Sequence, residues 1–155
     1  MRFLLVAASL GLVLGSPAAP VEYEMAWTVS ARLTVWKGGE TVTTREALSG
    51  RATARLLTVA PAVLKLEFGG PEGGGEGYIG PGGPTALVFP SPLTVPVPPP
   101  LPHLTGGSFE LRGPANRPQG FRLDYVEGFI CRATPRVCGG VAMWEQRFEA
   151  RAERP

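Results

Sequence analysis

Residues 23–36 read YEMAWTVSARLTVW, and the strict alternation along this stretch decides the fold. Its odd positions are mostly apolar and its even positions mostly polar, a pattern typical of a β-strand with one buried face. At about 3.3 Å per residue, the stretch predicts a strand of roughly 46 Å, far longer than the usual length of about five or six residues. A strand of this length needs a broad sheet beside it and an apolar layer over its odd face.

The same two-residue period continues through most of the chain. Glycines 38 and 39 predict a tight hairpin after the first strand, because two adjacent glycines supply the positive φ angles of a two-residue loop. Ser49-Gly50 predicts the next turn, and the glycine- and proline-rich residues 69–84 predict a loop with one short apolar step. Further strands are expected at 41–48, 51–59, 62–68, 85–89, 108–112, 121–130 and 141–151.

No convincing apolar period of 3.6 residues follows the N-terminal segment. The fold class predicted is therefore all-β, with about eight or nine antiparallel strands in a curved open sheet or incomplete β-barrel. A β-sandwich is the alternative. Residues 75–80 fit the spacing G-x-G-x-x-G, but prolines follow where a dinucleotide site needs a helix, so a flexible turn is expected there.

The N-terminus has the features of a secretory signal peptide. A positive start at Met1-Arg2 precedes an apolar run at 3–14, and small residues follow at 15–19. The apolar run is too short for a transmembrane helix, which needs about 20 residues. We expect residues 1–18 to be a signal peptide and residues 19–155 to be a single β domain without a transmembrane segment, exported to the periplasm or the extracellular space.

Composition excludes some partners. The formal net charge of +2 over 155 residues is nearly neutral, so no nucleic-acid partner is indicated. Residues 90–102 contain seven prolines in thirteen positions, and proline cannot occupy the middle of a sheet because it lacks a backbone donor. We expect this segment to be a semi-rigid crossover that lies over the sheet, and the alternative is a Pro-x-x-P ligand for an aromatic groove.

The two cysteines, Cys131 and Cys138, bracket a short turn between two predicted strands. In an exported chain this spacing predicts a disulfide, which by loop entropy would contribute roughly 2–3 kcal/mol. The chain contains one histidine, His103, so no metal site and no cofactor are expected. Asp124 is the sole aspartate and no G-x-S-x-G motif occurs, so an enzyme is not expected, and a hydrolase is only the third hypothesis.

A curved sheet without covering helices would leave an apolar hollow on its concave side. The residues expected to line this face are Trp27, Val29, Leu33, Leu66 and Phe89, with residues 90–102 as the cover. The function predicted is a monomeric, non-enzymatic binder of an apolar ligand, with a lipid, a lipoprotein or an envelope protein as partner. The alternative is a structural or interaction module of the envelope with a packed core.

The order of these features resembles the LolA-like periplasmic lipoprotein carriers and the related sensor domains of the MucB/RseB kind. The stretches that carry the resemblance are AWTVSARLTVW (26–36), LSGRATARLLTVAPAVLKLEF (48–68) and YIGPGGPTALVFPSP (78–92). The resemblance implies an unclosed β-barrel whose apolar concave face holds acyl chains under a lid. Lids in that family are helical, whereas this chain offers the proline-rich run instead.

Overall fold

The structure of the protein is a computed structural model that describes residues 20–93, 104–131 and 141–155. The predicted signal peptide (1–18), most of the proline-rich crossover (94–102) and Cys138 lie outside the described residues. Within the described ranges every regular element is a β-strand. None of these ranges contains a helix with the length and apolar character needed to cross a membrane.

Eight strands form one antiparallel sheet, which confirms the predicted fold class. The spatial order is β5-β4-β3-β2-β1-β8-β7-β6, so the long first strand lies near the centre, as its length requires. The strands are β1 (Val21–Lys37), β2 (Glu40–Ala60), β3 (Val63–Gly69), β4 (Gly75–Gly80), β5 (Gly83–Val88), β6 (Leu104–Arg112), β7 (Gly120–Cys131) and β8 (Val141–Glu153).

The hairpin between β1 and β2 forms at the predicted glycines. Gly38 and Gly39 have φ angles of 59° and 83°, and Lys37 pairs with Glu40 across the turn. Two positive φ angles match the right-handed twist of the flanking strands. The pairing then continues without a break from this turn to Val21 opposite Leu56.

The turn predicted at Ser49-Gly50 is wrong, because both residues lie inside the continuous strand β2. Gly50 pairs with Trp27 of β1, and a Cβ atom at Gly50 would lie 2.5 Å from Cζ2 of the Trp27 indole. Glycine therefore stands in this strand to make room for a large neighbour, which is a role it commonly has within sheets.

The loop predicted at 69–84 is also wrong in part. Residues 75–80, expected to form a flexible turn, form strand β4 between β3 and β5. Gly75 and Gly77 allow close packing, since a Cβ at Gly77 would lie 2.5 Å from Cδ1 of Leu87. Gly75 and Gly77 thus reflect tight packing between strands, whereas Gly73 and Gly83, with φ angles of 123° and 109°, have the backbone conformation typical of turn glycines.

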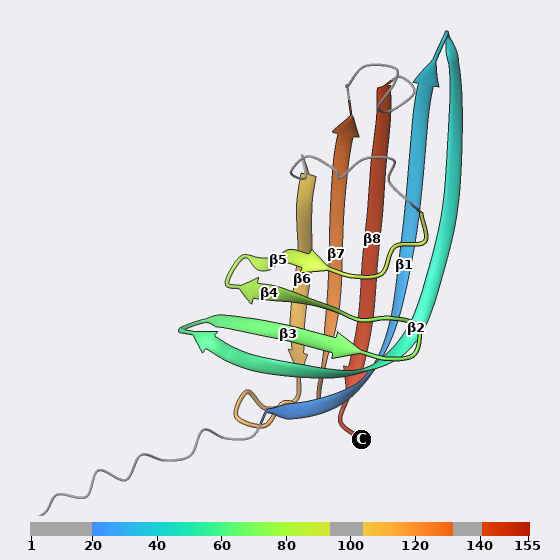
Figure 1. Cartoon of the computed structure of the whole chain (residues 1–155). Coiled ribbons are helices and arrows are strands. Elements are labelled where there is room, and N and C mark those ends of the chain that lie inside the picture. The colour runs from blue at the N-terminus through green and yellow to red at the C-terminus, as the bar shows by residue number, and fades with distance from the viewer. Residues whose placement is uncertain (1–19, 94–103, 132–140) are drawn as a thin grey trace, which may run out of the picture.

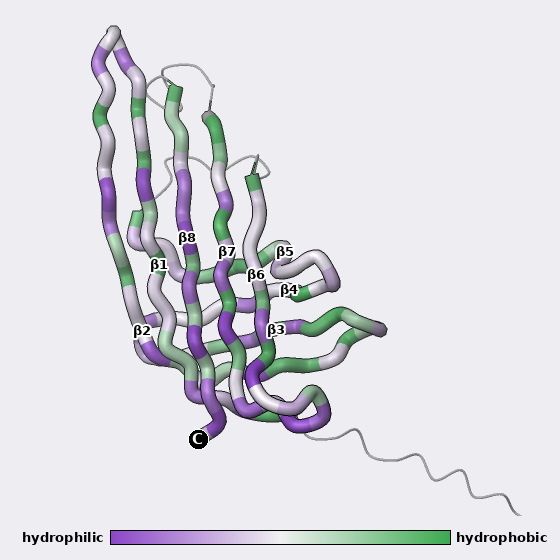
Figure 2. The backbone as a smooth tube through the Cα atoms, turned by 180° about the vertical axis from the view of Figure 1, so that it is seen from behind, coloured by the Kyte–Doolittle hydropathy of each residue, from purple (hydrophilic) through white to green (hydrophobic). Residues whose placement is uncertain are grey.

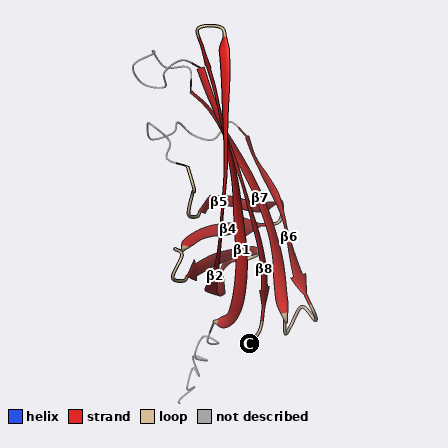
Figure 3. Cartoon of the chain, turned by 90° about the vertical axis from the view of Figure 1, so that its right-hand side faces the viewer, coloured by secondary structure: helices blue, strands red, loops and turns tan. Residues whose placement is uncertain are grey.

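The sheet bends until its two edge strands approach each other, which makes an almost closed barrel with one open seam. Strands β3, β4 and β5 cross in front of the lower part of β6, β7 and β8, and β2 curves from one layer into the other (Figure 1). At the seam, a Cβ at Gly107 of β6 would lie 2.9 Å from Cγ of Pro84 in β5. The side view shows the upper parts of the long strands extending beyond β3–β5 (Figure 3).

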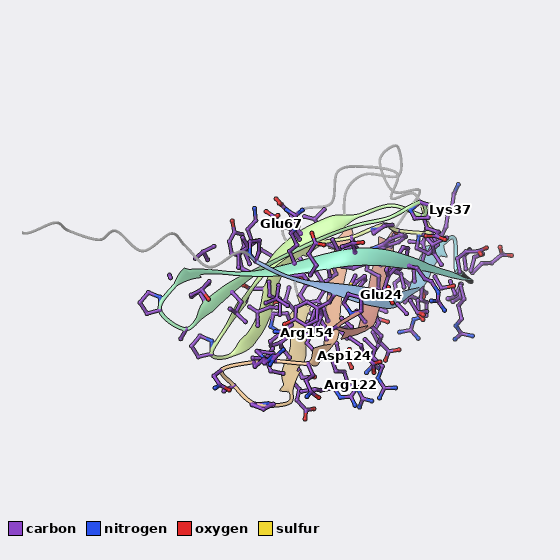
Figure 4. The ribbon with its side chains drawn as sticks, turned by 90° about the horizontal axis from the view of Figure 1, so that it is seen from below. Glu24, Lys37, Glu67, Arg122, Asp124 and Arg154 are labelled. Atoms are coloured by element: carbon purple, nitrogen blue, oxygen red, sulfur yellow. The ribbon has the colours of Figure 1, made fainter. Side chains whose placement is uncertain are left out.

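The inner and outer faces follow the period of two. Along β8 the even residues from Ala142 to Ala152 are buried, and the odd residues are exposed or half-buried. The alternation of polar and apolar segments is visible along the long strands from behind (Figure 2). Seen from below, the labelled charged residues Glu67, Arg122 and Asp124 lie around the outside of the barrel (Figure 4).

Candidate functional site: the concave face of the sheet

The lower part of the barrel is filled by a packed apolar cluster, here called the lower core. It contains four of the five residues predicted to line the concave face: Trp27, Val29 and Leu66 are fully buried, and Phe89 packs against them half-buried. These side chains therefore point to the inner face as expected. They are brought together in a protein core whose members come from all eight strands.

Aromatic rings make up much of the lower core. The Phe148 ring is central, because its centroid lies 6.2 Å from that of Trp27, 5.4 Å from Phe68 and 5.1 Å from Phe89. Phe89 also meets Tyr125 edge-to-face at 6.0 Å. Such pairs contribute about 0.5–1.5 kcal/mol each beyond the area they bury. The lower core accordingly stabilises the fold.

Leu33, the fifth predicted residue, lies elsewhere. It packs half-buried in a second apolar cluster, here called the upper cluster, with Ala31, Leu93, Phe129 and Trp144. None of these residues belongs to β3, β4 or β5, so the cluster lies on the upper, extended part of the long strands. Leu93, at the beginning of the proline-rich segment, packs against this cluster, and the predicted crossover beyond it lies outside the described residues.

A polar layer separates the two clusters. Glu127 lies between Tyr125 and Phe129 on the inner face of β7, and Gln146 lies between Phe148 and Trp144 on the inner face of β8. The two residues pair directly across the strands. Both are buried, with 7% and 8% of their surfaces exposed, although an ionisable side chain is rarely buried without a partner of opposite charge.

Hydrogen bonds hold the Glu127 carboxylate in place. The Tyr125 hydroxyl donates to Oε2 over 3.1 Å, and the Gln146 amide nitrogen donates to Oε1. Burial raises the pKa of the Tyr125 hydroxyl, and the charge and hydrogen bond of Glu127 raise it further. Among the described residues, no lysine or arginine forms an ion pair with Glu127.

Three buried side-chain polar atoms lack a partner within the described part of the chain. One, Oε1 of Gln146, belongs to the polar layer; the others are Nε1 of Trp144 in the upper cluster and Nε1 of Trp27 in the lower core. The NH₂ group of Gln146 faces Glu127 and donates to its carboxyl oxygen, which turns the amide oxygen away from that partner. A buried acceptor and a buried donor without partners are uncommon in proteins and are often associated with function.

Sequence reasoning missed Glu127 and Gln146, although a signal was present. Each is the single polar residue on the inner face of an otherwise apolar alternation, in Phe121–Phe129 for β7 and in Trp144–Phe148 for β8. A buried polar residue carries more information than an apolar one in the same place.

The seam forms an apolar hollow. It has a volume of about 400 Å³ and is lined by residues of β3, β4 and β6 and of the turn before β3, including Leu64, Ile79, Phe109 and Leu111. It opens at the side of the lower barrel. Leu64 and Phe109 belong to the rim of the lower core, so the hollow exposes the edge of that core to solvent.

The outer face is a charged surface. A shallow hollow of about 640 Å³ over β1, β2, β7 and β8 is lined mainly by polar and charged residues, among them Arg32, Arg45 and Glu145. Arg32 pairs with Glu145, and Arg147 contacts Asp124 at 2.5 Å. Ion pairs in such exposed positions contribute about 0–1 kcal/mol each.

Other predicted features stay predictions. The Cys131–Cys138 bridge involves residue 138, which is outside the described residues, and so is His103. Within residues 20–93, 104–131 and 141–155 no group of three metal-ligating side chains is present. A scan against protein-family models and a search of curated proteins each found no match to this sequence.

Proposed function

We propose that the protein is an exported, non-enzymatic binder of an apolar ligand, such as a lipid or the acyl chain of a lipoprotein, on the concave face of its sheet. The observation that carries the proposal is the upper cluster. It continues the apolar inner face past the level at which β3–β5 contribute to the core. Export follows from the predicted signal peptide, and the resemblance to lipoprotein carriers agrees with the proposal.

In this proposal the two halves of the sheet have different tasks. The lower core holds the fold together and is filled by its own aromatic side chains. The upper cluster occupies two adjacent inner rows about 7 Å apart, with Ala31 in one row and Leu33, Trp144 and Phe129 in the next, and Leu33 is only half-buried. An apolar chain bound there would gain about 25 cal/mol for each Å² of apolar surface buried.

Native mass spectrometry of the mature protein from its source, or loaded with a fluorescent fatty-acyl probe, tests the proposal. We expect an additional lipid-sized mass or saturable probe binding. Leu33→Asn should weaken probe binding roughly tenfold or more, because burying a leucine side chain contributes about 1.5–3 kcal/mol. The control is Leu104→Asn, since Leu104 is exposed on β6 and 57% accessible.

The alternative function, an interaction module of the envelope, is favoured by a different observation. Within the described residues β6 pairs only with β7, and its other edge faces the seam. An unpaired edge can accept a strand from a partner protein. This alternative predicts no bound mass and no probe binding, which is the result that would overturn the ligand-binding proposal.

A further inference from the structure

We propose that the polar layer binds the primary ammonium group of an amphiphile whose hydrocarbon chain lies along the upper cluster. The inference rests on the proposed function and names the chemical class of its ligand. Its starting point is the position of Glu127, a buried carboxylate at the boundary between the lower core and the upper cluster.

The carboxylate has hydrogen-bond donors but no counter-charge. Tyr125 and Gln146 donate to its two oxygens, and neither is charged. The arginines nearest in sequence register, Arg32 and Arg147, lie on the outer face and pair with Glu145 and Asp124 there. Because burial of an uncompensated charge is unfavourable, a ligand cation at this layer would complete the charge balance.

The unpartnered amide oxygen of Gln146 independently indicates a donor in the ligand. Only 8% of the residue's surface is exposed, and its amide nitrogen donates a hydrogen bond to Glu127. The buried amide oxygen has no hydrogen-bond partner and is therefore left to accept one. A primary ammonium group carries three donors, so one group can serve both the carboxylate and the amide oxygen.

The upper cluster suits the remainder of such a ligand. Trp144 is the next inward residue after Gln146 on β8, and an indole face attracts a cation held close to it. Ala31 lies beside Gln146 in the row of the polar layer, and Leu33 and Phe129 lie with Trp144 in the next row away from it. A cation at the base and a hydrocarbon chain along the strands is thus the arrangement that fits both surfaces.

The test compares dodecylamine with dodecanol, which has the same chain and no charge, by isothermal titration calorimetry on the mature protein. We expect dodecylamine to bind at least tenfold more tightly. Glu127→Gln should remove this preference and leave dodecanol affinity within twofold. The matched control is Glu46→Gln, which removes a carboxylate from the same row of the sheet at an exposed position on β2.

The outcomes separate the two proposals. If neither compound binds, the proposed function itself fails. If both bind the wild-type protein with equal affinity, or if dodecanoate binds more tightly than the amine, the apolar site stands and the ammonium inference is wrong. The wild-type comparison decides the matter even where Glu127→Gln does not fold.

Discussion

Gly50→Ala tests the packing of the lower core. A Cβ atom at this position would lie 2.5 Å from Cζ2 and 2.8 Å from Cε2 of Trp27, and 2.8 Å from Cβ of Glu72. Glu72 is in an exposed loop and can move, whereas Trp27 is 2% exposed and stacked on Phe148. The indole must shift to accept even one methyl group.

The expected loss of stability follows from two opposing effects. Overpacking a well-filled core costs about 1–3 kcal/mol. Replacing a strand glycine by alanine returns about 0.5–1 kcal/mol, because the unfolded chain becomes less flexible. We therefore expect a net loss of roughly 0.5–2 kcal/mol. Urea denaturation followed by circular dichroism should show a lower midpoint with an unchanged slope.

Gly106→Ala is the matched control, since Gly106 also lies inside a strand and a Cβ there would meet nothing within 4 Å. It should be neutral or slightly stabilising. Trp27→Phe removes the clashing part of the indole, so it should be less harmful in the Gly50→Ala background than alone, with a coupling energy of roughly 0.5–3 kcal/mol. Wild-type stability in Gly50→Ala, or strict additivity of the two changes, would refute the described packing of Trp27 on Gly50.

Three further predictions concern pH and redox state. The folded-state pKa of Tyr125 is raised above its unfolded value near 10. The contribution of this hydroxyl to the free energy of unfolding is therefore fully present below pH 10 and is lost as the pH rises further. Tyr125→Phe should flatten this alkaline decline in the free energy of unfolding. Gln146→Glu would place two buried carboxylates side by side, and their repulsion would raise the pKa of one of them. The variant should therefore unfold at a lower temperature than wild type at pH 7, and calorimetric scans should show a smaller difference in unfolding temperature at pH 4. Equal differences at the two pH values would argue against a shared layer with Glu127. If the predicted Cys131–Cys138 bridge forms, no thiol should react with Ellman's reagent in the unreduced, denatured protein. Reduction of the bridge should lower the free energy of unfolding by roughly 2–3 kcal/mol. Two titratable thiols would contradict the predicted bridge.

The period of two was sufficient to predict the fold class, because a two-residue alternation leaves the chain no option but extended backbone with one buried face. The hairpin at Gly38-Gly39 was predictable for the same local reason, since positive φ angles at both positions match one turn type. What failed was the interpretation of the other glycines. Gly50 and Gly77 have no side chain because Trp27 and Leu87 occupy that space, and such neighbours come from other strands.

The candidate site shows the same division between local and long-range information. All five predicted lining residues are on the inner face, which follows from alternation alone. Their division into a lower core and an upper cluster depends on how far β3–β5 reach across the long strands, and this is set by the bend of β2 rather than by any local pattern (Figure 1).

The polar layer required one more piece of information, the register between β7 and β8. Alternation alone marks Glu127 and Gln146 as polar residues on apolar faces, but a shift of one residue in the pairing would turn one of them to the opposite face from the other. The register Glu127 opposite Gln146 brings them into contact and leaves one amide oxygen without a partner. Replacing a buried polar pair by apolar residues of the same shape is often neutral or stabilising, so stability alone does not require this pair. Both polar residues stand at the point where the filled core ends and the upper cluster begins, and this position is the reason we propose a ligand that reaches the boundary.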